Sequence, residues 1–208
     1  MTSSHSANPS TPQTDTRNQL RKHIRARRNQ LASDEQYQAS MDLIAQVMAT
    51  PEAAQAQHIA LYIATDGELD TQPLIEALWH TGKSVYVPVI HPFAKGHLLF
   101  LAYTPDSKLC FNRYGIIEPR LTLNAIIPVA DLDLILTPLV AFDAQGQRLG
   151  MGGGYYDRTL AQWENTADGP KAIGLAHDCQ RVEQLPVESW DVPLEKIITP
   201  TQIWTWKS

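Results

Sequence analysis

The chain has 208 residues, of which 43% are hydrophobic, and its formal net charge is −5. This length suits a single domain with a sizeable core, and the negative charge argues against a general nucleic-acid-binding surface. There is no apolar run of about eighteen residues, and the two cysteines form neither a metal-ligand spacing nor a disulfide framework. We therefore expect a cytoplasmic protein that binds neither nucleic acid nor membranes.

The N-terminal segment differs in composition from the rest of the chain. Residues 1–16 lack an apolar stretch and are rich in Ser, Thr, Pro and Gln, as is typical of a disordered tail rather than a secretory signal. We find no internal repeat and no linker in the remainder. The sequence thus predicts a tail over 1–16 and a single α/β domain over 17–208.

A basic helix is expected directly after the tail, because Leu20, Ile24 and Leu31 share one face at helical spacing. Its arginines include Arg17, Arg21 and Arg28, which fall in a stripe beside the apolar face. Arg27 falls on the apolar face itself. Most charge runs are solvated faces. The functional alternative is that Arg17 and Arg21 reach a polyanion along the edge of the packed face.

Helical and strand-like patterns then alternate along the chain. Residues 33–48 and 73–81 repeat apolar side chains at helical spacing, and a further helix is expected at 155–163. Short apolar runs typical of strands occur at 58–64, 83–90, 97–103, 132–142, 171–179 and 195–200. This order favours an α/β fold with a mostly parallel sheet covered on both faces.

A glycine-rich segment, 150–154, lies between the strand expected at 132–142 and the helix expected from Tyr155. Ligands of open α/β sheets bind beyond the carboxyl ends of the strands, where bare backbone lets several N–H groups converge on an anion. Arg148 would add a positive charge whose geometry suits phosphate oxygens. The pattern therefore predicts a phosphate-binding loop, with a flexible surface loop as the alternative.

Two common nucleotide-binding motifs are absent from the sequence. The dinucleotide fingerprint G-x-G-x-x-G lacks its last glycine, and the Gly-Lys-Ser run at 82–84 has Ala77 where a Walker A motif needs its first glycine. Gly82 is better explained as the cap of the preceding helix. Asp157, in the first turn of the expected helix, suits either the helix dipole or a Mg²⁺ that accompanies a polyphosphate.

Several other side chains have an ordinary structural explanation. His177 and Cys179 end an expected strand and are more commonly a packed histidine and a buried thiol than ligand contacts. Trp79 repeats at helical spacing and is best explained as core. We expect one of Tyr155 and Tyr156 to face the ligand and the other to pack into the core. The sequence does not indicate which of the two faces the ligand.

The segment GQRLGMGGGYYDRTL at 146–160 resembles the signature of the 5-formyltetrahydrofolate cyclo-ligases, also called methenyltetrahydrofolate synthetases. The resemblance runs from Arg17 to the C-terminus and includes YIATDGELDT, YGIIEP and LPVESWDVPLEKIITP. It implies a three-layer α/β/α domain similar to sugar-phosphate isomerases and CoA transferases. It also implies an ATP- and Mg²⁺-dependent conversion of 5-formyltetrahydrofolate to 5,10-methenyltetrahydrofolate, by a monomer that acts on small molecules.

The resemblance also assigns roles to individual residues. It implies that Arg17 and Arg21 contact ATP, that Glu68 contacts the folate, and that Asp157 and Asp191 bind Mg²⁺. Arg148 and Tyr155 are implied as catalytic residues. The implied triphosphate site comprises Arg148, Gly150, Met151, Gly152, Gly153, Gly154, Tyr155 and Tyr156, and the folate is implied to border Met151 to Tyr155.

One departure from the family pattern concerns the charge of the loop. Met151 and Gly153 stand where many relatives carry Arg or Lys, so Arg148 and the N-terminal arginines would supply more of the positive charge. We expect Arg148 to be exposed on the loop and to matter little to stability. The alternatives to a ligase are a sugar-phosphate isomerase or CoA-transferase-like enzyme and a non-catalytic phosphate-sensing domain. Neither explains an arginine-rich helix beside a magnesium carboxylate.

Overall fold

An eight-stranded sheet forms the centre of the protein, whose computed structural model describes residues 12–112, 115–161, 163 and 169–206. The strand order is β12-β11-β10-β7-β1-β2-β3-β6. The strands span His58–Ala60 (β1), Ser84–Ile90 (β2), Leu98–Ala102 (β3), Ile126–Ile127 (β6), Leu134–Pro138 (β7), Lys171–Leu175 (β10), Lys196–Ile198 (β11) and Ile203–Thr205 (β12). The adjacent strands from β11 to β2 are parallel, which confirms the mostly parallel sheet.

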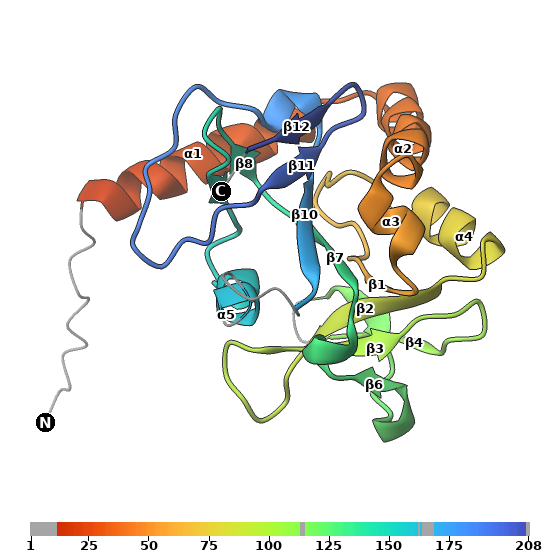
Figure 1. The fold of residues 1–208 in the computed structure, drawn as a ribbon. Coiled ribbons are helices and arrows are strands. Elements are labelled where there is room, and N and C mark those ends of the chain that lie inside the picture. Colours follow the sequence, from red (N-terminus) through yellow and green to blue (C-terminus); the bar gives the residue numbers. More distant parts are fainter. Residues whose placement is uncertain (1–11, 113–114, 162, 164–168, 207–208) are drawn as a thin grey trace, which may run out of the picture.

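Helices cover both faces of this sheet. They span Pro12–Arg28 (α1), Ser33–Met48 (α2), Pro51–Gln55 (α3), Gln72–His80 (α4) and Tyr155–Ala161 (α5), with a 3-10 turn at Asp178–Gln180 (η3). Figure 1 shows α2, α3 and α4 together on one face and α5 on the other, which confirms the three-layer arrangement. Within the described ranges, no helix is both long enough and apolar enough to cross a membrane.

Two cores lie on opposite faces of the sheet, because successive side chains of a strand point to opposite sides. Ile59 of β1 belongs to a buried cluster with Leu43 of α2 and Leu74 of α4. The next residue, Ala60, belongs to a second cluster that includes Leu160 of α5. The near-continuous apolar runs of the central strands follow from this burial on both faces.

The direction of the chain connections reverses between β1 and β7, which are neighbours in the sheet. From β1 the chain continues through α4 to β2, and from β7 it continues through α5 to β10 on the other side. Open α/β sheets bind ligands outside the carboxyl ends of the strands at such a point. Helix α1 packs at this edge, where Ile24 forms a buried cluster with Val140 and Leu149.

The run expected as one strand at 132–142 is divided. Strand β7 ends at Pro138, and Ala141–Phe142 (β8) then forms a hairpin with Arg148–Leu149 (β9). The buried side chain of Asp143 stabilises this turn, since its Oδ1 accepts from the N–H groups of Gln145 and Gln147. A second small hairpin pairs Leu109–Phe111 (β4) with Ile117–Pro119 (β5).

The N-terminal helix differs from expectation in two respects. It begins at Pro12, inside the segment assigned to the tail, and proline suits a first helical turn because its nitrogen needs no partner there. Residues 1–11 lie outside the described part of the chain, so the rest of the tail stays a prediction. Arg27 is exposed and Arg28 is fully buried, which shows that the assignment of Arg27 to the apolar face was wrong.

Candidate active site

Helix α1 carries a row of inward-facing arginines toward the carboxyl ends of the strands. Arg17 is buried, and its guanidinium binds both oxygens of Asp191 at 2.6 and 2.9 Å. Burial works to raise the pKa of Asp191, but the bonds from Arg17 and from the Glu188 N–H outweigh it and lower that pKa. The predicted ATP contact and the predicted magnesium ligand are therefore partners of each other in this structure.

Arg148 lies on β9 and is 4% exposed, so the expectation of an exposed loop arginine was wrong. Its Nε donates to the carbonyl of Val192 at 3.1 Å, and its NH2 group donates to Asp157 Oδ1 at 2.6 Å. Burial lowers the pKa of Arg148, while Asp157 and Asp191 oppose that shift. The site is thus built around two adjacent ion pairs, Arg17–Asp191 and Arg148–Asp157.

The glycine loop follows β9 and leads directly into α5. Arg21 reaches it from α1, and its Nε donates to the carbonyl of Gly150 at 2.8 Å. Gly152 has a φ of 97°, and a Cβ there would lie 3.4 Å from the Arg21 guanidinium carbon. Met151 and Gly153 are exposed. The loop therefore presents open backbone beside the Arg21 side chain, as a phosphate-binding loop requires.

The two tyrosines after the loop diverge. A Cβ on Gly153 would lie 2.7 Å from the ring of Tyr155, so that ring covers the loop backbone. The ring of Tyr156 packs against the core on the α5 side, and no described group hydrogen-bonds to its buried hydroxyl. Burial and the nearby Glu68 carboxylate both raise the pKa of Tyr156. Buried hydroxyls normally have a partner, so this one is a candidate contact for a bound molecule.

Glu68 ends a tight turn that follows β1. Asp66 and Gly67 have φ values of 52° and 71°, and the Glu68 N–H donates to the carbonyl of Thr65 at 2.9 Å. The Glu68 Oε2 atom accepts from the Thr65 N–H at 3.0 Å. Burial raises the pKa of Glu68, although these bonds and Arg28 oppose the shift. The turn thus holds a half-buried carboxylate in one orientation, near enough to Tyr156 to raise the pKa of its hydroxyl.

Helix α1 also contacts this turn, through Arg25 and Arg28, for which the sequence predicted no partner. Arg28 Nε donates to the carbonyl of Asp66 at 2.9 Å, and both Arg25 and Arg28 pair with the Asp66 carboxylate at 2.6 and 3.0 Å. The available signal was the Asp-Gly pair, which indicates a turn with positive φ. The same helix therefore contacts both the glycine loop and the turn that carries Glu68.

His177 lies just after β10 at the same edge and is 2% exposed. Burial and the nearby Arg28 lower its pKa to about 4, against weaker opposing effects from Asp178 and from the backbone of Gly67 and Glu68. Its Nε2 atom has no hydrogen-bond partner among the described residues. The packed-histidine interpretation is confirmed, and the neutral ring lies beside the Glu68 turn.

Arg158 is a further cation at the loop that the sequence did not single out. Its Nε donates to the carbonyl of Gly96 at 2.7 Å, and its NH2 group donates to the carbonyl of Gly153. A positive charge in the first turns of a helix opposes the helix dipole, and this was the available signal. Arg158 therefore links the glycine loop to the loop before β3.

Neither ion-paired carboxylate belongs to a metal cluster in the part of the chain that the structure describes, where no three His, Cys, Asp or Glu side chains gather. Both oxygens of Asp191 are bonded to Arg17, whereas one oxygen of Asp157 is bonded to Arg148. Mg²⁺ needs only one or two carboxylates when phosphates complete its coordination. Asp157, which keeps one oxygen outside this bond, suits that role better than Asp191, and both magnesium assignments stay predictions.

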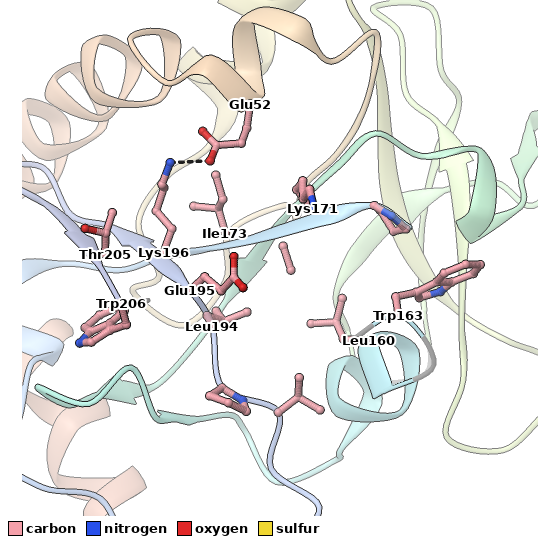
Figure 2. A pocket seen from close by; sticks show the side chains of 14 residues that line it. Glu52, Leu160, Trp163, Lys171, Ile173, Leu194, Glu195, Lys196, Thr205 and Trp206 are labelled. Atoms are coloured by element: carbon pink, nitrogen blue, oxygen red, sulfur yellow. Dashed lines mark hydrogen bonds and ion pairs between the residues drawn. The ribbon is translucent and has the colours of Figure 1, made fainter. Parts of the chain in front are cut away.

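A pocket of about 300 Å³ lies elsewhere, beside the C-terminal end of α5 and the first residues of β10 and β11. Figure 2 shows its apolar side chains, Leu160 and Ile173 among them, with the Lys196–Glu52 ion pair at one end. A second pocket, of about 320 Å³, is lined by His91, His97 and Arg158. The second pocket adjoins the glycine loop through Arg158, and the first lacks any predicted site residue among its described lining.

Comparison with known proteins shows which family the chain belongs to. The model of the 5-formyltetrahydrofolate cyclo-ligase family matches residues 13–200. The chain belongs to this family. It is 51% identical to a 5-formyltetrahydrofolate cyclo-ligase of Escherichia coli over 88% of this chain and 100% of that protein. It is 49% identical to one of Haemophilus influenzae over 89% of this chain and 98% of that protein.

Solved structures confirm the relationship at the level of the fold. A 5,10-methenyltetrahydrofolate synthetase of Aquifex aeolicus matches with a TM-score of 0.77 and 29% identity, covering 91% of this chain and 92% of that one. One from Mycoplasma pneumoniae matches with a TM-score of 0.68 and 25% identity, covering 88% and 98%. Membership in the cyclo-ligase family identifies the chain as a ligase of folate one-carbon metabolism and disfavours the isomerase and phosphate-sensor alternatives. The likeness to sugar-phosphate isomerases and CoA transferases stays a prediction.

Proposed function

We propose that the chain uses ATP and Mg²⁺ to convert 5-formyltetrahydrofolate to 5,10-methenyltetrahydrofolate, with release of ADP and phosphate. Besides family membership, one structural observation supports this proposal. The glycine loop after β9 and the Glu68 turn lie at the same edge of the sheet, and α1 contacts both, through Arg21 and Arg28. A nucleotide phosphate and a pterin bound there would lie next to each other.

The phosphate end of the site is formed by the loop and by α1. Open backbone at 150–154 would donate N–H groups to the triphosphate, and Arg21 adds a charge whose bonds are to Gly150 and Asn18. Arg17 and Arg148 are ion-paired and buried, so their first role is to fix the walls of the site. A direct contact of either arginine with ATP would need a change in these ion pairs. The catalytic role of Tyr155 stays a prediction.

The folate end is formed by Glu68 and Tyr156. A pterin ring offers both N–H donors and ring acceptors along one edge, which suit a carboxylate and a hydroxyl placed side by side. The hydroxyl of Tyr156 gains its missing partner when such an edge binds. We therefore assign Tyr156 to the folate and Tyr155 to the shape of the loop.

The reaction needs the formyl oxygen to become a leaving group. In the proposed sequence the formyl oxygen attacks the γ-phosphorus of ATP, and ADP departs with the electron pair of the broken P–O bond. N10 then adds to the activated carbon and closes the ring, the N10 proton passes to the departing phosphate or to water, and the C–O bond breaks to release phosphate. Such transfers depend on positioning and on charge around the phosphoryl oxygens rather than on a protein nucleophile.

Mg²⁺ would be held by Asp157 and the phosphates, where it would neutralise charge on the transferred group. Asp157 lies at the loop, and its side chain is 20% exposed, so a ligand can reach it. Arg148 holds one of its oxygens and thereby orients the other. This arrangement holds the carboxylate in one orientation before the nucleotide arrives.

Absorbance of methenyltetrahydrofolate tests the proposal directly. Purified protein is mixed with 5-formyltetrahydrofolate, ATP and Mg²⁺, and each component is omitted in turn. We expect product only in the complete mixture, with one ADP formed for each product molecule. Product formation without ATP would rule out phosphoryl transfer, and ADP formation without product would rule out the assigned substrate.

A further inference from the structure

Of four arginines around the glycine loop, two are ion-paired with carboxylates in the described part of the chain and two are not. Arg17 and Arg148 each form an ion pair with a carboxylate, Asp191 and Asp157 respectively. Arg21 and Arg158 also bond to the loop, but each donates to its backbone carbonyls. Among the described residues, neither Arg21 nor Arg158 forms an ion pair with a carboxylate. The uncompensated charge at the loop therefore comes from these two arginines.

The two arginines flank the loop at its opposite ends. Arg21 lies against Gly150 and Gly152, whereas the Arg158 guanidinium lies 2.7 Å from the position of a Cβ on Gly154. Gly154 has a φ of 64°, a conformation that favours glycine. The backbone between the two guanidinium groups is open on its outer side, since Met151 and Gly152 are exposed. A linear polyanion laid along the loop would have a cation at each end.

Arg158 is also accessible to such a ligand, and its guanidinium carbon lies 5.7 Å from the centre of the Tyr155 ring. It is exposed, and it lines the pocket of about 320 Å³ next to the loop. Its bonds are to the carbonyls of Gly96 and Gly153, and phosphate oxygens are stronger acceptors for a guanidinium than neutral carbonyls are. A phosphate could therefore take over these bonds without leaving a buried charge unpaired.

We propose that Arg158 is a nucleotide-binding residue that contacts the triphosphate from the α5 side of the glycine loop, opposite Arg21. This inference rests on the proposed use of ATP. The Arg148 guanidinium, in contrast, is ion-paired with Asp157.

Three substitutions separate this role from a structural one. Arg158→Gln removes the charge but keeps an amide donor for the carbonyls of Gly96 and Gly153. Arg158→Lys keeps the charge but loses the planar fork. Arg27→Gln serves as the control, because Arg27 is exposed on α1 and carries the same charge. Thermal unfolding of all three variants should match the wild type, since these side chains are exposed.

The dissociation constant of Mg²⁺–ADP and of a non-hydrolysable ATP analogue is measured by calorimetry, with the KM for each substrate. We expect Arg158→Gln to weaken binding of the analogue about tenfold or more, Arg158→Lys to retain most of the affinity, and Arg27→Gln to have no effect. The KM for 5-formyltetrahydrofolate should stay unchanged in all three.

Two results would overturn the inference. One is wild-type nucleotide affinity in Arg158→Gln. The other is a selective rise in the KM for 5-formyltetrahydrofolate, which would assign Arg158 to the folate instead. Failure of the proposed function is distinguishable, because it would appear in the wild type as product formed without ATP.

Discussion

The guanidinium of Arg148 lies 2.6 Å from Asp157 Oδ1, so the arginine before the glycine loop is paired with the aspartate after it. This bond closes the segment 148–157 into a loop whose ends are held together. The arginine side chain is 2% exposed and the aspartate side chain 20% exposed. The loop is therefore shaped by an internal ion pair before any ligand binds.

Arg148→Ala should destabilise the fold as well as abolish activity. Removing one partner of a buried pair leaves the other charge poorly compensated, which costs about 3 kcal/mol. The Val192 carbonyl would also lose its bond from Arg148. Urea unfolding measures the effect, with Arg27→Ala as the matched exposed control. Equal unfolding free energies for the two variants would contradict the structural role of Arg148.

Gly67→Ala should disturb the Glu68 turn selectively. Gly67 has a φ of 71°, and a Cβ there would collide with Asn29 Oδ1 of the segment after α1. Gly82→Ala is the matched control, because Gly82 has a φ of 76° and nothing within 4 Å of its Cβ position. We expect the control to cost about 1 kcal/mol of backbone strain and Gly67→Ala to cost more. Only Gly67→Ala should raise the KM for 5-formyltetrahydrofolate, and an equal rise in both would refute the assignment of this turn to the folate.

Tyr156→Phe should leave the free protein about as stable as the wild type, because the hydroxyl that it removes has no described partner. Tyr62→Phe is the comparison, since the Tyr62 hydroxyl donates to the carbonyl of Leu69 at 3.2 Å and its loss should cost about 1 kcal/mol. Chemical denaturation measures both. Binding of 5-formyltetrahydrofolate should weaken in Tyr156→Phe, and unchanged affinity would remove Tyr156 from the folate site.

His177 should make stability depend on pH below neutrality. Its pKa is lowered from 6.5 to about 4 by burial and by Arg28. Between these pH values the unfolded chain binds a proton that the folded chain does not, so the free energy of unfolding falls as the pH falls. Above pH 6.5 the imidazole is neutral in both the folded and the unfolded chain, so it does not reduce stability. Acidification from pH 6.5 to about 4 lowers the free energy of unfolding by roughly 3 kcal/mol.

His177→Gln tests this linkage through the midpoint of thermal unfolding as a function of pH. The variant should show a flatter profile than the wild type between pH 6.5 and about 4. His80→Gln is the control, because His80 is exposed, and it should follow the wild-type profile. A wild-type slope in His177→Gln would mean that the histidine is not held neutral in the fold.

The fold was largely predictable because it follows from periodicity. Apolar runs without alternation indicate strands buried on both faces, and the glycines after one of them marked the end of the sheet where the site lies. The stripe of arginines predicted that Arg17 and Arg21 reach a polyanion, which stays a prediction. Arg21 does bond to Gly150, although the neighbouring assignment of Arg27 failed by one residue.

The pairing of charges at the site was not predictable from local sequence. Arg148 is buried because Asp157 and the carbonyl of Val192, 44 residues away, converge on it. Nothing in the residues next to Arg148 signals either partner. The interruption of the strand at 132–142 likewise depends on Asp143, whose Oδ2 accepts from the N–H of Leu185 at 3.0 Å. Such contacts arise from tertiary structure.

A crystal structure with Mg²⁺–ADP and 5-formyltetrahydrofolate bound tests the account most directly. We predict that the diphosphate lies along residues 150–154 between Arg21 and Arg158, with the pterin edge on Glu68 and Tyr156. Phosphates bound at another edge of the sheet, with the glycine loop unliganded, would contradict it.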